Sequence, residues 1–303
     1  RSHLSGCVRS VSLGGAPTWQ EAALKALHVA LHYYLGAAPH AYEVCEVPEG
    51  GGITEAVARR FRAGFDCVAA AGGDGTVSAV AHVLLGSGVP LAIVPAGTGN
   101  LVARELGIPL DIESSVGLLA GTWRERKIDA MRIGARTYLL NAGVGVNAEV
   151  IDQTSRLGKS LFGRSAYVGT AVWQVLQAKS QRLEITVDDT AGVYEATDVL
   201  ISNCGGLARV LHPNGPDIQM DDGVVDVCIM CMKTPLEYPW YYLLKWIKPK
   251  HVNRVIHEVS ASRRVRVACE RPIAVQADGD IIGVTPGEIE VLPNALAVVV
   301  GLA

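Results

Sequence analysis

Apolar residues recur with a helical period over several stretches in the first part of the chain. Between positions 18 and 36 they return every three or four residues, which predicts an amphipathic helix with a Thr18–Glu21 capping box and a stop at Gly36. Short continuous apolar runs, typical of buried strands, lie between such stretches. The pattern predicts helices over 18–36, 54–64, 77–85 and 100–107, and buried strands over 65–71 and 89–97.

From about residue 123 the pattern changes to short, β-branched stretches separated by Gly, Pro, Asp and Asn. Many of these stretches alternate apolar and polar residues, as strands with one buried face do. The predicted strands lie within 127–146, 182–189, 193–203, 223–232, 263–269, 272–280 and 288–300, and a helix over 165–178 interrupts them.

These patterns predict two domains, and 303 residues are enough to build both cores. Alternating strands and helices indicate a parallel sheet with right-handed crossovers, so residues 1–125 are expected to form an α/β domain. Residues 126–303 are expected to form a mostly antiparallel β domain. We leave open whether the last residues return to the first domain.

Composition narrows the class of protein. Apolar residues make up 49% of the chain and charged residues 19%, which is typical of a packed globular protein. The net charge of −3 and the lack of a recognisable nucleic-acid module predict no nucleic-acid partner. No apolar run approaches the roughly 20 residues that span a bilayer, so we predict a cytoplasmic protein. The seven scattered cysteines are expected to be reduced.

Two glycine-rich segments follow the two predicted buried strands. They are GGDGT (Gly72–Thr76) and PAGTGN (Pro95–Asn100). At the carboxyl ends of parallel strands, such segments can bring backbone N–H groups and a helix N-terminus close to a bulky anion. Two of them on successive strands favour nucleotide phosphate as the ligand. The alternative is that the glycines only make tight strand-to-helix turns.

Asp74 indicates a cation at the same place. A carboxylate beside phosphates repels them unless a cation lies between, so we expect Asp74 to face Mg²⁺ or its waters. Neither segment has the lysine of a Walker A motif or the spacing of a dinucleotide fingerprint. The predicted cofactors are therefore ATP and Mg²⁺.

The spacing of these and later motifs resembles the diacylglycerol kinase catalytic domain family. The matching segments are AAGGDGTV, VPLAIVPAGTGNLVARELGIP, NAGVGVNAEVI, MDDGVVDV and ADGD, which run from about residue 65 to the end of the chain. The family includes bacterial soluble lipid kinases and is related to the sphingosine and ceramide kinases. The resemblance implies an α/β nucleotide-binding domain similar to that of NAD kinase and phosphofructokinase, then a β-sandwich lipid-binding domain, with the active site between them.

The resemblance also implies roles for individual residues. The positions that match ATP contacts, together with their neighbours in the two glycine segments, are Gly72, Gly73, Asp74, Gly75, Thr76, Gly97, Thr98 and Asn100. Asp278 and Asp280 match an acidic pair in which the first acts as the catalytic base and the second assists, and Asp74 completes the predicted catalytic set. A structural Mg²⁺ is implied at Asp222 and the carbonyl oxygens of Gln219 and Val224.

General chemistry agrees with a carboxylate as base, because it can accept the proton of an alcohol while a phosphoryl group is transferred. For Asp278 the alternative is an ordinary Asp-Gly hairpin turn.

Several positions depart from the family pattern. Ser78 and Ala79 stand where Asn and Glu are usual, Leu101 where many members have Asp, and Asp280 where Glu is usual. The N-terminal strand and its glycine loop are also unrecognisable.

The segment 236–254 gathers Tyr and Trp residues beside Lys and Arg. Aromatic rings with basic neighbours favour the level of lipid headgroups, so we predict peripheral membrane contact there. The alternative is an amphipathic helix that packs its aromatic face on the β domain.

The main hypothesis is an ATP- and Mg²⁺-dependent kinase that phosphorylates a hydroxyl of a diacylglycerol-like or sphingoid-like lipid at the membrane surface. One alternative is a catalytically weakened relative that binds lipid or nucleotide, and another is a kinase of a soluble substrate such as NAD. The sequence gives no prediction of the acyl chain, activators or oligomeric state.

Overall fold

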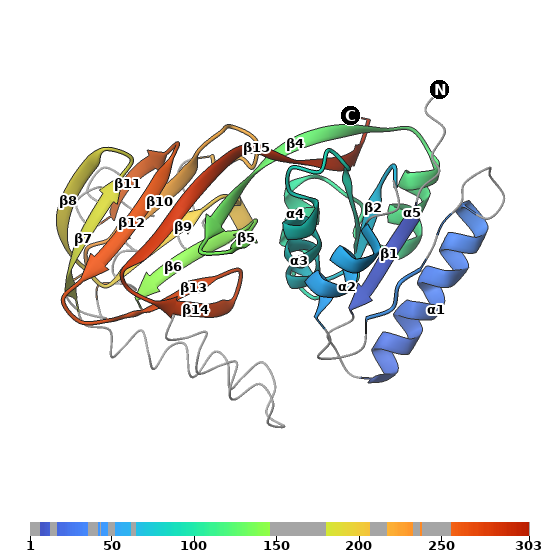
Figure 1. The fold of residues 1–303 in the computed structure, drawn as a ribbon, viewed down its shortest axis with the longest axis horizontal. Helices are drawn as coiled ribbons and strands as arrows, with labels where there is room; N and C mark the ends of the chain where they lie inside the picture. Colours follow the sequence, from blue (N-terminus) through green and yellow to red (C-terminus); the bar gives the residue numbers. More distant parts are fainter. Residues whose placement is uncertain are drawn as a thin grey trace. The chain divides into compact units, whose positions relative to one another are not determined.

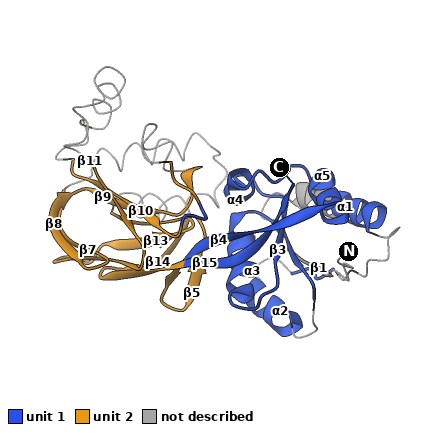
Figure 2. Cartoon of the chain, turned by 90° about the horizontal axis from the view of Figure 1, so that it is seen from above, with its two compact units in different colours: residues 1–130, 220–222, 293–303 blue, residues 131–219, 223–292 orange. Residues whose placement is uncertain are grey.

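The computed structural model describes residues 7–12, 17–35, 42, 44–47, 52–61, 65–145, 180–206, 217–232, 237 and 256–302 (Figure 1). The predicted helix over 165–178 lies outside the described residues, as does the predicted membrane segment 236–254 except for Glu237. The chain divides into two compact units (Figure 2). Unit 1 comprises residues 1–130, 220–222 and 293–303, and unit 2 comprises 131–219 and 223–292.

Unit 1 is built on parallel strands with helices. Strand β1 (Cys7–Ser12) pairs with β2 (Val68–Gly72), β2 pairs with β3 (Leu91–Pro95), and Val298 of β15 (Gly287–Gly301) pairs with Leu91 of β3, all in parallel. The helices are α1 (Pro17–Tyr34), α2 (Ile53–Arg60), α3 (Asp74–Leu84), α4 (Leu101–Glu105) and α5 (Ile112–Ala120).

Small residues on the central strands let helices pack closely against the sheet. Ala69 and Ala71 of β2 lie in one buried cluster with Leu27 and Leu31 of α1 and Val116 of α5. Successive side chains of a strand point to opposite faces, so the residues between these alanines face the other side. Helix α3 directly follows β2 and packs against β2 and β3.

Unit 2 is a sandwich of two antiparallel layers. Its strands are β4 (Trp123–Ile133), β5 (Arg136–Tyr138), β6 (Asn141–Gly145), β7 (Gln181–Val187), β8 (Thr190–Ala196), β9 (Asp198–Ser202), β10 (Val225–Met230), β11 (Ile256–Ala261), β12 (Arg264–Cys269), β13 (Ala274–Ala277) and β14 (Asp280–Val284), with β4 beginning in unit 1 and the first part of β15 completing the unit. One layer has the order β11-β10-β9-β6-β13-β14, and the other contains β15-β12-β7-β8 with β4 and β5.

The core of unit 2 lies between the two layers. Leu183, Val265 and Ile289 come from the layer that contains β7, β12 and β15. Ala142 and Val227 come from the six-stranded layer, and all five side chains are buried in one cluster. The predicted fold class, a parallel α/β domain followed by a mostly antiparallel β sandwich, is confirmed.

Several predicted boundaries were wrong. Helix α3 begins at Asp74, three residues before the predicted start, because Gly73 is its N-cap and the rest of GGDGT forms its first turn. Helix α2 ends at Arg60, and α4 is only five residues long.

Some elements were not predicted at all. Helix α5 was missed, although the Asp111 carboxylate caps it by accepting the Ser114 N–H at 2.7 Å. The predicted strand 272–280 ends at Ala277, and β11 and β14 are additional strands. None of the helices in the described part of the chain combines the length and apolar character needed to cross a bilayer.

Candidate active site

The two glycine segments pack directly on each other at Gly73 and Gly97. A Cβ added to Gly97 would lie 2.4 Å from the Cα of Gly73, and one added to Gly73 would lie 3.3 Å from the Cα of Gly97. The Ala96 N–H also donates to the Gly72 carbonyl at 3.0 Å, which joins the ends of β2 and β3. At these two positions the lack of a side chain allows the two backbones to come into contact.

Asn100 fixes the shape of the second segment. Its Oδ1 accepts the N–H of Gly97 at 3.0 Å, and its Nδ2 donates to the carbonyl of Gly97 at 2.8 Å. Asn100 has a φ of 49° and is 9% exposed. An asparagine tolerates this left-handed conformation because its short side chain can bond nearby backbone, as it does here.

Asp74 connects the two segments. Its Oδ1 accepts the N–H of Val102 at 3.2 Å. A Cβ on Gly99 would lie 3.0 Å from Oδ2, so Gly99 makes room for the carboxylate. Burial raises the pKa of the Asp74 carboxyl, while N–H donors led by Val102 and Leu101 act in the opposite direction. Asp74, in the first turn of α3, therefore holds the start of α4, which directly follows the second segment.

The remaining predicted cofactor residues differ in what they present to solvent. Gly75 is exposed in the first turn of α3, and no described atom lies within 4 Å of the Cβ position that its backbone defines. Thr98 is exposed as well. Thr76 is only 6% exposed, and Gly72 is a buried residue of β2. The open edge of this region is therefore formed by Gly75 and by Thr98 with its neighbour Gly99.

The ADGD motif forms a tight hairpin between β13 and β14. Ala277 pairs with Asp280, and the two residues between them have positive φ, 46° at Asp278 and 93° at Gly279. Positive φ at both central residues is the mark of a type I′ turn, for which Asp-Gly is a preferred sequence. The structure thus shows the hairpin that the sequence offered as the alternative for Asp278.

The Asp278 side chain is bonded by three consecutive backbone N–H groups. Oδ2 accepts from Leu139 at 3.0 Å, and Oδ1 accepts from Leu140 at 3.0 Å and from Asn141 at 3.1 Å. The Asp278 N–H returns a bond to the Asn141 carbonyl at 2.9 Å. The hairpin is thereby tied to the turn between β5 and β6.

Buried amide side chains support this arrangement, and the sequence analysis missed them. Gln276 is fully buried, donates to Asn141 Oδ1 at 3.2 Å and accepts the Gly279 N–H at 3.3 Å. Asn203 Nδ2 donates to the Leu139 carbonyl at 2.9 Å. The sequence signal that could have found them is an amide residue within an apolar strand, because a buried amide needs hydrogen-bond partners.

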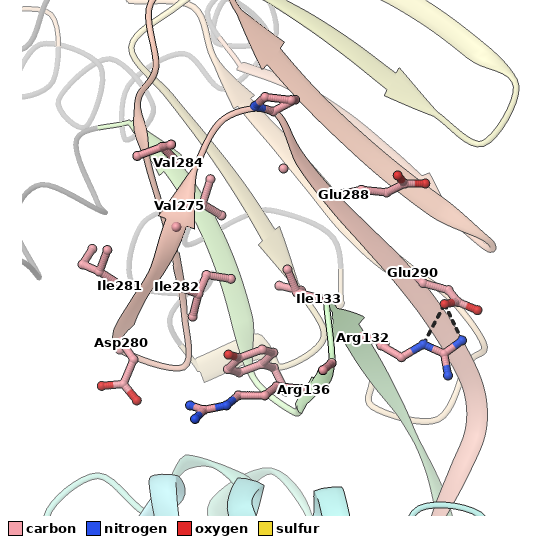
Figure 3. Close-up of a pocket in the computed structure, with 17 residues that line it drawn as sticks. Arg132, Ile133, Arg136, Val275, Asp280, Ile281, Ile282, Val284, Glu288 and Glu290 are labelled. Carbon is pink, nitrogen blue, oxygen red and sulfur yellow. Dashed lines mark hydrogen bonds and ion pairs between the residues drawn. The ribbon is translucent and has the colours of Figure 1, made fainter.

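A groove of about 1020 Å³ lies beside the hairpin within unit 2 (Figure 3). Ile133, Ile282 and Val284 give it an apolar lining. In Figure 3, Asp280 and Arg136 lie at the same end of the groove, away from the Arg132–Glu290 ion pair. The Tyr138 ring also lines the groove, and burial raises the pKa of its hydroxyl, with the Arg136 charge opposing and the Asp278 and Asp280 charges adding to the shift.

The predicted metal residues Gln219, Asp222 and Val224 lie in the turn before β10. The adjacent Asp221 is bound by the Arg126 guanidinium through two bonds of 2.7 Å, and this contact holds the pKa of the Asp221 carboxyl below its ordinary value. Asp222 is exposed. Asp221 therefore has a cationic partner within the protein.

Comparison with known proteins identifies the family. Residues 20–133 match the family model described as diacylglycerol kinase catalytic domain, and residues 141–300 match the YegS C-terminal NAD kinase beta sandwich-like domain. A protein named diacylglycerol kinase from Mycobacterium tuberculosis is 30% identical over 251 residues, which cover 78% of this chain and 77% of the relative. The chain belongs to the diacylglycerol kinase family. The family predicted from the motif spacing is therefore confirmed.

This diacylglycerol kinase family member is also similar to a longer protein and to a solved structure. An uncharacterized protein of Synechocystis is 29% identical over 238 residues, which cover 77% of the chain and 54% of that relative, so the chain spans about half of the length of this protein. A crystal structure of a diacylglycerol kinase from Bacillus anthracis superposes with a TM-score of 0.74 at 22% identity and covers 98% of both chains. This likeness supports the fold. The chain is thus a member of a lipid kinase family.

Proposed function

We propose that this chain transfers the γ-phosphoryl group of ATP to a hydroxyl of a diacylglycerol-like or sphingoid-like lipid at a membrane surface. The observation that carries the proposal is the difference in surroundings between two glycines of the first segment. Gly73 is used by contact with Gly97, whereas Gly75 leaves open space at the start of an eleven-residue helix. A phosphate group is what such a helix N-terminus favours, because N–H groups and the helix dipole both meet its charge.

The residues present suit Mg²⁺. Asp222 and the backbone carbonyls of Gln219 and Val224 are oxygen donors, which magnesium prefers, and they follow one another in a single turn. We assign them to a structural ion. We assign Asp74, whose carboxylate lies beside Gly99, to the ion that accompanies the nucleotide. Bound magnesium would offset the negative charge of the nucleotide phosphates.

We assign the acceptor side of the reaction to unit 2. The ADGD hairpin supplies the carboxylates Asp278 and Asp280, of which one removes the proton of the acceptor hydroxyl. The neighbouring groove offers apolar residues such as Ile282 and Val284 for the hydrocarbon part of a lipid. Contact with the membrane is assigned to segment 236–254, on the strength of its aromatic and basic residues.

The test is phosphate transfer from γ-labelled ATP and Mg²⁺ to a panel of acceptors: 1,2-dioctanoylglycerol, sphingosine, ceramide and NAD. We expect a labelled lipid with the wild type and none with the Asp278→Asn/Asp280→Asn double variant, whose thermal unfolding is followed in parallel. A wild type that labels only NAD would replace the lipid substrate by a soluble one. Binding of ATP without any labelled product would favour the weakened relative, for which Ser78 and Ala79 in place of the usual Asn and Glu are the motivating observation.

A further inference from the structure

We propose that the guanidinium of Arg136 binds the phosphoryl group while this group passes from ATP to the acceptor hydroxyl. The inference rests on the proposed lipid kinase activity. It gives a catalytic role to a residue of β5 that lies outside the motifs singled out in the sequence, and it follows from the charges around the ADGD hairpin.

The two acids of the hairpin create a need for positive charge. Asp278 and Asp280 flank Gly279 in one turn, and both belong to the hairpin that is proposed to take the proton of the acceptor hydroxyl. The γ-phosphoryl group that arrives there is itself negative, so like charges meet unless cations lie beside them. Neither glycine segment contains a lysine or an arginine. A cation on the acceptor side, in addition to magnesium, would therefore stabilise the transfer.

Arg136 lies in the region where that charge is needed. It is an exposed residue that lines the groove, and Figure 3 shows it at the same end of the groove as Asp280. Its guanidinium donates a hydrogen bond to the Tyr138 hydroxyl. Burial is the main cause of the raised pKa of that hydroxyl, and the charges of Arg136, Asp278 and Asp280 act on it as well. The arginine and both acids therefore surround the same hydroxyl.

Two connected hairpins position Arg136 relative to the acids. Arg136 pairs with Ile133 across the two-residue turn that joins β4 to β5. Just beyond β5, the N–H groups of residues 139–141 donate to the Asp278 carboxylate at 3.0 to 3.1 Å. These bonds fasten the end of β5 to the ADGD hairpin. Because the backbone of Arg136 is fixed in this way, binding a phosphoryl group orders little more than one side chain.

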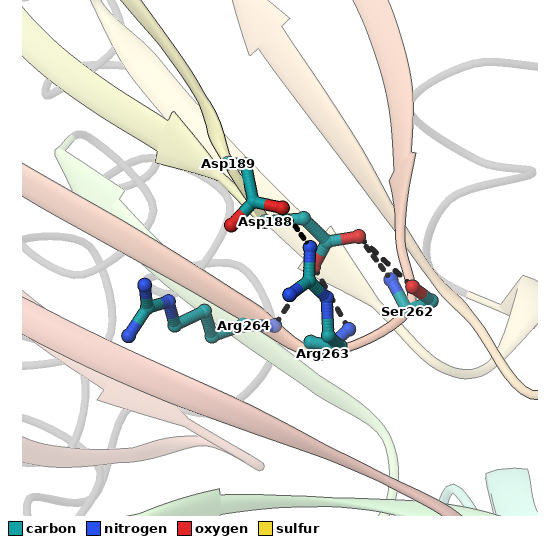
Figure 4. Close-up of polar contacts among 5 residues, drawn as sticks. All are labelled: Asp188, Asp189, Ser262, Arg263 and Arg264. Atoms are coloured by element: carbon teal, nitrogen blue, oxygen red, sulfur yellow. Dashed lines mark hydrogen bonds and ion pairs between the residues drawn. The ribbon is translucent and has the colours of Figure 1, made fainter.

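The guanidinium of Arg136 differs from those of two other arginines in unit 2. Arg132, which also lines the groove, donates two hydrogen bonds to Glu290, at 2.8 and 2.5 Å. Arg263, in the β11–β12 turn, forms an ion pair with Asp189 (Figure 4). In the part of the chain that the structure describes, no carboxylate lies within ion-pair distance of Arg136. Its planar guanidinium can therefore bind two phosphoryl oxygens at once.

In the proposed transfer, a carboxylate of the hairpin accepts the proton of the acceptor hydroxyl while the hydroxyl oxygen forms a bond to the γ-phosphorus. The bond from the γ-phosphorus to the oxygen that bridges to the β-phosphate breaks, and its electron pair leaves with ADP. Arg136 exchanges neither a proton nor electrons, and its charge lies against the oxygens of the phosphoryl group. After the transfer, the same contact binds the phosphate of the lipid product.

The test compares Arg136→Gln and Arg136→Lys with Arg263→Gln, which makes the same change at an exposed arginine that does not line the groove. Each variant is assayed with γ-labelled ATP, Mg²⁺ and 1,2-dioctanoylglycerol micelles, and its Tm is recorded. We expect Arg136→Gln to lose about 10²- to 10³-fold in kcat, as when one group that stabilises transition-state charge is removed. Arg136→Lys should lose less, because lysine keeps the charge without the two-pronged contact. Arg263→Gln should keep the wild-type kcat.

Two further measurements separate phosphoryl binding from a structural role of Arg136. Guanidinium chloride, at concentrations too low to change the Tm, should restore part of the kcat of Arg136→Ala and leave the wild-type kcat unchanged. Inhibition by 1,2-dioctanoyl phosphatidic acid should weaken by roughly tenfold in Arg136→Gln, because a charged hydrogen bond to the phosphate is lost. The Kd of ADP should stay at the wild-type value, since ADP lacks the transferred group.

The inference is overturned if Arg136→Gln retains the wild-type kcat, or if Arg263→Gln loses as much. It is also overturned if the loss at Arg136 comes with a lowered Tm and without rescue by guanidinium, because Arg136 would then serve only to hold Tyr138. A wild type that phosphorylates no acceptor removes the proposed function itself, and this inference with it. An active wild type with an unaffected Arg136→Gln removes the inference alone.

Discussion

The substitution Gly97→Ala adds one methyl group and tests the close backbone contact between the two glycine segments. The Cβ of Gly97→Ala would lie 2.4 Å from the Cα of Gly73 and 2.9 Å from Oδ1 of Asn100. Both neighbours are constrained, since Gly73 is the N-cap of α3 and Asn100 bonds Gly97 on both of its backbone polar groups. The methyl group therefore cannot be accommodated by rotation of a flexible side chain alone.

The cost can be worked out from these contacts. Displacing packed backbone typically costs about 1–3 kcal/mol. Disturbing the Asn100 hydrogen bonds adds about 1 kcal/mol. We therefore expect Gly97→Ala to lower the free energy of unfolding by roughly 2–4 kcal/mol, which corresponds to a fall in Tm of roughly 5–15 °C.

Gly75→Ala is the matched control, because no described atom lies within 4 Å of the added Cβ. Alanine is the better helix former by about 1 kcal/mol, so its Tm should equal or exceed that of the wild type. If phosphate lies at Gly75, the KM for ATP should still rise by roughly tenfold, the equivalent of about 1.4 kcal/mol. Differential scanning calorimetry and ATP titration of the kinase reaction give the two readings.

Two outcomes would contradict these expectations. A Gly97→Ala protein that unfolds at the wild-type temperature would contradict the backbone contact between the segments. A Gly75→Ala protein with an unaltered KM for ATP would contradict phosphate binding at the start of α3, whatever the outcome at Gly97.

Three further predictions concern other parts of the chain. Arg126 lowers the pKa of Asp221 in the folded state, so Asp221→Asn should destabilise the protein by about 1–2 kcal/mol at neutral pH. The difference in stability between variant and wild type should shrink as the pH falls below about 4, where the Asp221 carboxylate of the wild type becomes protonated, and urea midpoints at several pH values can show this. Chelation of Mg²⁺ should lower the Tm of the wild type and leave that of Asp222→Ala unchanged; equal shifts would exclude the proposed structural ion. Sedimentation with anionic liposomes should fall when Trp240 and Trp246 become Ala, and unchanged binding would rule out contact through that segment.

The main helices and strands could be predicted from the order of residues wherever their pattern is local. Helix α1 follows from apolar residues three and four apart, and β2 and β3 follow from short runs of small and β-branched residues. The change to alternating stretches after residue 123 was enough to predict the antiparallel second part. The order and spacing of the glycine segments and the later acidic motifs were enough to predict the family.

The contacts among the residues of the candidate site could not be predicted, because they depend on which strands pair in the folded chain. Asp278 meets N–H groups from 137 to 139 positions away in the chain, and no local pattern records that distance. The start of α3 at Asp74 was not predicted for a similar reason. GGDGT has the composition of a loop, but in the structure Gly73 is the N-cap of α3 and contacts Gly97 of the other segment. Side-chain periodicity encodes which face of an element is buried, whereas the partner on that face is set by the fold as a whole.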